Sequence, residues 1–173
     1  MQRGEGTEKT QGELMRILII SDSHETKNPI TKAIENEPTA NILIFLGDGE
    51  KGFLEVAAVY PEKKFYYVQG NCDFDSNLKN DEVIEIENKK ILITHGHKYD
   101  VKNGLSKLLK EAKIKNADIV LYGHTHIPSA NKTNGLYMMN PGSVSNPNEG
   151  LPTYGVIDII GEQIYMGIKE FIY

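Results

Sequence analysis

Residues 16–24 read RILIISDSH, a run of large aliphatic residues that stops at Asp22 and His24. A short apolar run without polar alternation is typical of a strand buried on both faces of its sheet. The same pattern recurs at four later places, 41–46 (NILIFL), 64–69 (KFYYVQ), 90–94 (KILIT) and 118–122 (DIVLY). These five segments predict the central strands of the fold.

The segments around these runs predict helices and hairpins. Helices are expected at 29–37, 52–59 and 105–115, the last with apolar residues at helical spacing. Hairpin turns are expected at Asn88-Lys89, Asn134-Gly135 and Gly161-Glu162, joining 82–87 to 90–94, 130–133 to 136–139 and 154–160 to 164–172. Strands that alternate with helices and then give way to hairpins predict an α/β fold, a sandwich of two mixed β-sheets flanked by helices.

The bulk properties fit one globular domain. A chain of 173 residues with 39% hydrophobic and 25% charged residues can bury one substantial core. Residues 1–14 are polar and aperiodic, so we expect a disordered or non-native tail before a single domain at 15–173. The lone cysteine, Cys72, fits a reducing, cytoplasmic compartment, and no apolar run is long enough for a membrane span.

The net charge of −5 gives no general attraction to nucleic acid or to an anionic membrane. A phosphate-bearing substrate would therefore need a local positive feature. Because no basic stripe is evident, long nucleic acid is not an expected partner, whereas a homo-oligomer stays open.

Metal-ligand side chains follow each of the five predicted strands. All five histidines of the chain lie in these segments, which contribute Asp22 and His24, Asp48, Asn71 to Asp73, His95 and His97, and His124 and His126. Loops converge at the carboxyl edge of an open α/β sheet, so we expect these side chains to meet there. Residues i and i+2 of an extended segment point to one side, which predicts that Asp22 converges with His24, and His124 with His126.

Each motif also has an ordinary explanation when it is taken singly. Asp-Ser-His is a common helix cap, and Gly-Asp and Gly-Asn are common turns. The complete set, in one order and at five strand ends, favours a metal site over five such coincidences.

The ordered set DSH, GD, GNCD, HGH and GHTH resembles the motifs of the calcineurin-like metallophosphoesterases, from about Met15 to the C-terminus. It is most similar to their small single-domain phosphodiesterase branch in bacteria and archaea, which shares GNCD, HGH and the NPGS at 140–143. The resemblance implies the calcineurin-like phosphoesterase fold and two bound divalent ions. One ion would be held by Asp22, His24, Asp48 and His126, and the other by Asp48, Asn71, His95 and His124. These oxygen and nitrogen donors suit Mn²⁺, with Ni²⁺, Zn²⁺ or Fe²⁺ as alternatives.

The resemblance also implies the reaction, which is hydrolysis of a small phosphodiester by direct attack of a metal-bridging hydroxide. Three residues are candidates for catalytic roles. Cys72 stands where many relatives have a histidine thought to protonate the leaving group, and it is a weak acid candidate because a thiolate cannot donate a proton. Asp73 is expected to orient a ligand histidine, and His97 to contact the phosphate or the leaving group.

Two departures of this sequence from the family pattern, Cys72 and the segment after NPGS, bear on which substrates are cleaved. Weak protonation of the leaving group predicts a preference for diesters with good leaving groups over alkyl monoesters. The branch often carries an arginine after NPGS, whereas residues 145–149 contain none, so no cationic clamp for the phosphate is assigned.

Two other functions stay open at this point. A retromer subunit uses the same fold as a non-catalytic interaction scaffold, with a decayed metal site. A phosphomonoesterase or nucleotidase would share the site and differ in its pocket walls. The complete ligand set favours an enzyme over a scaffold.

Overall fold

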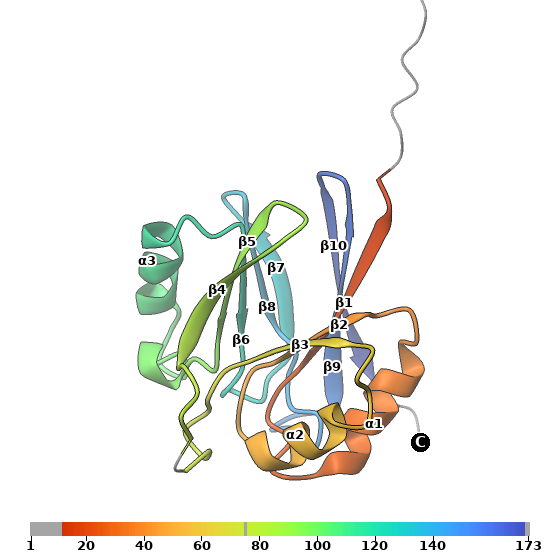
Figure 1. The fold of residues 1–173 in the computed structure, drawn as a ribbon. Coiled ribbons are helices and arrows are strands. Elements are labelled where there is room, and N and C mark those ends of the chain that lie inside the picture. The colour runs from red at the N-terminus through yellow and green to blue at the C-terminus, as the bar shows by residue number, and fades with distance from the viewer. Residues whose placement is uncertain (1–11, 75, 172–173) are drawn as a thin grey trace, which may run out of the picture.

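The structure, a computed structural model, describes residues 12–74 and 76–171. It contains two mixed five-stranded sheets, which confirms the predicted architecture (Figure 1). The first sheet has the order β10-β9-β1-β2-β3, with β10 (Gln163–Glu170), β9 (Thr153–Ile160), β1 (Leu14–Ile20), β2 (Ile42–Phe45) and β3 (Lys64–Tyr67). The second has the order β4-β5-β6-β8-β7, with β4 (Asp81–Ile86), β5 (Lys89–Thr94), β6 (Ile119–Tyr122), β8 (Leu136–Asn140) and β7 (Ser129–Thr133).

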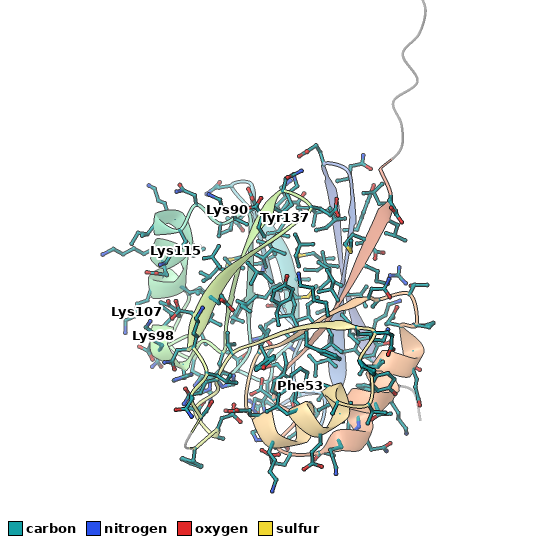
Figure 2. All side chains as sticks on the ribbon, in the orientation of Figure 1. Phe53, Lys90, Lys98, Lys107, Lys115 and Tyr137 are labelled. Carbon is teal, nitrogen blue, oxygen red and sulfur yellow. The ribbon has the colours of Figure 1, made fainter. Side chains whose placement is uncertain are left out.

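Helices cover the outer faces of the sandwich. Helices α1 (Lys27–Asn36) and α2 (Glu50–Ala57) pack on the first sheet, and α3 (Ser106–Ile114) packs on the second (Figure 1). Phe53 of α2, labelled in Figure 2, stacks on Phe45 with ring centroids 4.4 Å apart. Helix α3 buries Leu108 and Ala112, whereas Leu109, expected on the same face, is 39% exposed.

Alternate residues of the central strands serve two different cores. Ile17 and Ile19 of β1 point between the two sheets, where they join Ile93 and Leu121 of the other sheet. The intervening residues Leu18 and Ile20 of β1 face the helices. Because both faces of β1 are covered, its sequence shows no polar alternation, as the apolar run predicted.

The strand directions bring the predicted ligands to one end of the sandwich. Strands β1, β2 and β3 run parallel to each other, as do β5, β6 and β8. Their carboxyl ends therefore open into loops on the same side of each sheet. The segments 22–24, 47–49, 70–73, 95–96 and 123–126 all lie in those loops, and His97 begins the short 3-10 helix η1 (His97–Tyr99) that follows the fourth of them.

Element boundaries differ from the predictions in a few places. The turn between β4 and β5 is formed by Glu87 and Asn88, with φ of 48° and 57°, so the predicted Asn88-Lys89 turn is wrong by one residue. The Asn134-Gly135 turn between β7 and β8 is confirmed, with φ of 51° and 85°.

The two ends of the chain are described only in part. Of the expected N-terminal tail, residues 1–11 lie outside the described residues, and Leu14 already belongs to β1 and pairs with Ile160. Ile172, where the last strand was expected to end, also lies outside them. Within 12–74 and 76–171, no helix is long and apolar enough to cross a membrane.

Candidate metal centre

The first group of ligand atoms is formed by Asp22, His24 and His126, whose ligand atoms all lie within 4.8 Å of one another. His126 Nε2 is 3.1 Å from Asp22 Oδ1 and 3.3 Å from His24 Nε2. His126 Nδ1 lies 2.6 Å from the carbonyl oxygen of Asn146. Since a carbonyl only accepts, Nδ1 carries a proton, and in its neutral form the ring presents the lone pair of Nε2 to the group.

The second group is centred on His95, which is completely buried. Its Nδ1 donates to the carbonyl oxygen of Leu46 at 2.8 Å, so Nε2 is again the atom free to bind a ligand. Around Nε2 lie Asn71 Oδ1 at 3.0 Å, His124 Nδ1 at 3.1 Å and Asp48 Oδ2 at 3.4 Å. Residues from four separate loops thus meet within a few ångströms.

Asp48 lies between the two groups. Its carboxylate oxygen is within 4.8 Å of ligand atoms of Asp22 and His95, and of His24 and Cys72. The backbone N–H of Cys72 donates to Asp48 Oδ1 at 2.7 Å. Burial raises the pKa of Asp48, but hydrogen bonding and positive charge from His95 outweigh this and hold the pKa well below its usual range. Asp48 is therefore an anion that both groups share.

The arrangement fits divalent cations by its own geometry. Asp22 Oδ1 is buried and has no hydrogen-bond partner among the described residues, and Nε2 of His126, which carries no proton in the neutral ring, faces it at 3.1 Å. Around His95 Nε2, an amide oxygen and a carboxylate oxygen likewise converge on a lone pair. Facing acceptors repel each other unless a proton or a cation lies between them.

The histidine pKa values reflect the same crowding. Burial lowers the pKa of His95, but hydrogen bonding to Asp48 and the charges of both carboxylates raise it above its ordinary value. The hydrogen bond that a protonated Nε2 would donate to Asp22, together with the negative charge of Asp22, raises the pKa of His126. Burial and the nearby His95 lower the pKa of His124 to about 4. The oxygen and imidazole donors therefore suit ions such as Mn²⁺, Fe²⁺ or Zn²⁺, which compete with protons for the site.

Five of the seven predicted ligands adopt left-handed backbone conformations. Their φ values lie between 44° and 71°, at Asp22, His24, Asp48, His124 and His126. Such conformations are uncommon for residues other than glycine, and they concentrate at functional sites where surrounding structure holds them. Asp22 and His24 converge as expected, although their backbone is left-handed and not extended. The corresponding expectation for His124 and His126 is wrong. His124 faces His95, whereas His126 faces Asp22, so the two rings serve different groups.

The family model of the calcineurin-like phosphoesterase superfamily domain matches residues 15–162. The chain belongs to this superfamily. A probable metallophosphoesterase from Bacillus subtilis, YsnB, is 36% identical over 135 residues, which cover 77% of each chain. The phosphodiesterase MJ0936 from Methanocaldococcus jannaschii is 30% identical over 162 residues, covering 83% of this chain and 93% of the relative.

Solved structures support the fold of this chain. A predicted phosphoesterase from Streptococcus pneumoniae superposes with a TM-score of 0.78 at 27% identity, over 91% of this chain and 90% of the other. Vacuolar Protein Sorting 29 from Cryptosporidium parvum has a TM-score of 0.71 at 18% identity, over 94% and 99% of the two chains. At that identity, the second likeness shows the shared fold alone.

Asp73 binds backbone N–H groups and not an imidazole ring. Its Oδ1 accepts from the N–H groups of Gly49 and Glu50, and its Oδ2 accepts from those of Asp48 and Gly70, all at 2.8 Å. These bonds cap the start of α2 from a distance and fix the loop that carries Asp48. We expected Asp73 to orient a ligand histidine, and the structure instead shows it fixing the backbone around the shared carboxylate.

The other two catalytic candidates border the ligand groups. His97 is half-buried, with its ring centroid 5.4 Å from that of His95 and 6.2 Å from that of His124. Its Nδ1 is buried and has no hydrogen-bond partner among the described residues. Cys72 as a residue is exposed, but its thiol is partly shielded from solvent. This partial burial and the nearby Asp48 raise the pKa of the thiol to about 11.

Close backbone approach at Gly70 makes room for the shared carboxylate. A Cβ at this position would overlap Asp48 Oδ1 and the Asp48 backbone nitrogen. Only glycine therefore fits beside this ligand.

Sequence reasoning missed the residues that fix the loop of Asp22. Ser143 Oγ donates to the Asp22 carbonyl oxygen at 2.7 Å, and Ser145 Oγ donates to the carbonyl oxygens of Asp22 and Ser23 at 3.1 and 2.9 Å. The NPGS motif contains the first of these serines, but it gave no indication that its partner lies 121 residues away.

Proposed function

We propose that the protein is a metal-dependent phosphodiesterase with a dinuclear centre. The observation that carries this proposal is Asp48, a buried carboxylate shared by two adjoining groups of ligand atoms. One ion would be held by Asp22, His24, Asp48 and His126, and the other by Asp48, Asn71, His95 and His124. Mn²⁺ is the ion we favour for these donors, with Ni²⁺, Zn²⁺ or Fe²⁺ as alternatives.

When bound, two such ions would act as Lewis acids at the phosphoryl oxygens, and they would lower the pKa of a bound water so that hydroxide is available to attack phosphorus at neutral pH. The protein's own residues would position the substrate at these ions. Burial and the nearby His95 lower the pKa of His97, so its ring is neutral at pH 7. A neutral ring beside the ligand groups, with an unpartnered Nδ1, is placed to hydrogen-bond a phosphoryl or leaving-group oxygen.

The choice between diesters and monoesters depends on the leaving group. Without bound metal, burial and the nearby Asp48 raise the pKa of the Cys72 thiol to about 11, so the group is protonated and not the expected thiolate, but it is too weak an acid to be a good proton donor at neutral pH. Diesters with good leaving groups need little protonation, whereas alkyl monoesters depend on it. We therefore expect aryl diesters to be cleaved much faster than alkyl monoesters, which separates this function from a phosphomonoesterase or nucleotidase.

The interaction-scaffold alternative receives less support. All seven predicted ligands meet at one place, and such a set has no evident use in a scaffold that binds no metal. The relative MJ0936 is itself named a phosphodiesterase. We place the proposed enzyme in the cytoplasm, since its exposed cysteine suits a reducing compartment.

The proposal is tested with metal-stripped protein reloaded with Mn²⁺ and assayed on bis(p-nitrophenyl) phosphate, p-nitrophenyl phosphate and butyl phosphate. The diester should be the fastest substrate. Asp48→Asn should lower its kcat/KM by a hundredfold or more, about the upper end of losses from outer-shell changes at metal sites. A Mn²⁺-saturated protein that cleaves no diester, or full activity in Asp48→Asn, would refute the proposal.

A further inference from the structure

Two grooves flank the ligand groups, and their charges differ. The first has a volume of about 630 Å³ and begins at Cys72; its lining includes Glu25, Glu50, Glu55 and Asp73 against a single lysine, Lys51. We call it the acidic groove. The second has a volume of about 370 Å³ and is lined by Lys102 together with Val101, Leu105, Thr125, Ile127 and Asn148, among others. We call it the Lys102 groove.

The Lys102 groove adjoins the ligand groups through Thr125. This residue lies between His124 and His126 in the sequence, and its carbonyl oxygen accepts a hydrogen bond of 2.6 Å from Asn148 Nδ2. Lys102 also lies near enough to His124 and His126 for its charge to act on both rings. Thr125 thus connects the lining of this groove to both ligand histidines, which places the groove beside a molecule bound at the ligand groups.

Lys102 has no ion-pair partner among the described residues, unlike the lysines on either side of it. Lys98 pairs with Asp81 at 2.7 Å, and Lys107 pairs with Asp100 at 3.0 Å. Figure 2 labels both of these paired lysines beside α3. Lys102 is also the only charged residue in the lining of its groove. Its ammonium group is therefore available to an anion that enters from the ligand groups.

The rest of the groove lining is largely apolar or uncharged. Ile127 is 45% exposed, whereas Val101 and Tyr122 are almost fully buried beneath the surface. Ser129 and Thr125 add hydroxyl groups, and the Ser129 hydroxyl lies 3.3 Å from that of Tyr122. Such a lining suits a group with an apolar portion and one negative charge.

We propose that the Lys102 groove binds one ester arm of the phosphodiester substrate, and that this arm carries a second negative charge, such as a carboxylate or a further phosphate. This inference rests on the proposed function. The acidic groove would repel such an arm, so the charge difference between the two grooves fixes which way the substrate lies. Lys102 thereby supplies the local cation that residues 145–149 lack.

The test compares two p-nitrophenyl diesters with the same leaving group and arms of equal length, p-nitrophenyl 3-carboxypropyl phosphate and p-nitrophenyl butyl phosphate. The wild-type enzyme should prefer the carboxylate-bearing diester in kcat/KM. Lys102→Gln should reduce that preference by about three- to fivefold, the size of an exposed ion pair, and Lys102→Arg should retain it. Lys110→Gln, which removes an exposed charge from α3 outside the groove lining, is the matched control and should change nothing.

Binding gives a second readout that does not depend on turnover. Calorimetry measures the dissociation constants of the two products, 3-carboxypropyl phosphate and butyl phosphate. In Lys102→Gln, the preference for the carboxylate-bearing product should fall by the same factor of about three to five, the size of one exposed ion pair. A wild-type enzyme without preference, or a variant that slows both diesters equally, would overturn the inference alone. Hydrolysis of neither diester by the Mn²⁺-loaded wild type would overturn the proposed function as well.

Discussion

Asp73→Asn tests whether Asp73 acts by holding the backbone around Asp48. The native carboxylate accepts four N–H bonds at 2.8 Å, two at each oxygen, and is only 6% exposed. The asparagine amide keeps one acceptor oxygen and turns an NH₂ group toward two backbone N–H groups. Two favourable bonds are therefore replaced by donors that face each other.

The expected loss follows from those two bonds. A hydrogen bond to a charged group contributes about 1.5–3 kcal/mol to stability, so Asp73→Asn should lower the free energy of unfolding by about 3–5 kcal/mol. For a domain of this size, that loss corresponds to a fall of roughly 10 °C in Tm. Because the same amides fix the Asp48 loop, Mn²⁺ affinity should fall with stability.

Urea denaturation of the metal-free protein measures the effect without any contribution from bound ions. Asp118→Asn is the matched control, since Asp118 Oδ2 accepts a single 2.8 Å bond, from Lys90 N–H, at an exposed position. The control should lose less than about 1 kcal/mol. If Asp73→Asn keeps wild-type stability but loses diesterase activity, the structural role is wrong and Asp73 acts in catalysis.

Three further predictions concern the ligand groups. Gly70→Ala should abolish tight Mn²⁺ binding, because the new Cβ would displace the carboxylate of Asp48. Gly167→Ala is the control and should bind Mn²⁺ normally, since the space around Gly167 is open. Equal Mn²⁺ affinities of the two variants by calorimetry would contradict this. Neighbouring carboxylates outweigh burial at His95 and raise the pKa of both His95 and His126 above 6.5. Mn²⁺ must therefore displace protons from these rings, so its affinity should rise with pH until both rings are deprotonated and then level off. A constant affinity from about pH 6 to 9 would argue against this. Cys72→Ser should change the turnover of butyl phosphate, whose poor leaving group depends on protonation, by less than about tenfold, since a true general acid contributes a hundredfold or more. A larger loss in steady-state kinetics would make the thiol the acid.

The ligand identities were predictable because they depend on local sequence. Parallel strands place their carboxyl ends together, so a ligand-type side chain after each apolar run indicates a shared site. The turn at Glu87-Asn88 was misplaced by one residue because its register depends on burial. Ile84 pairs with Ile91, and both point into the core between the sheets, which leaves Glu87 in the turn.

The supporting contacts were not predictable, because they join residues that only the tertiary structure brings together. The amides that Asp73 holds belong to loops after β2 and β3, and these loops meet only when the two strands pair. The left-handed backbone of the ligand loops likewise has only a weak local signal, because Asp and His are enriched in this conformation but adopt it rarely. Lys102 gave none either, since its lack of an ion-pair partner among the described residues is visible only in three dimensions.

Anomalous diffraction from crystals of the Mn²⁺-loaded protein tests the central claim most directly. The proposed centre predicts two manganese peaks, both in contact with the Asp48 carboxylate, with His126 at one ion and His95 at the other. A single peak, or a second peak that Asp48 does not touch, would contradict the shared-carboxylate centre.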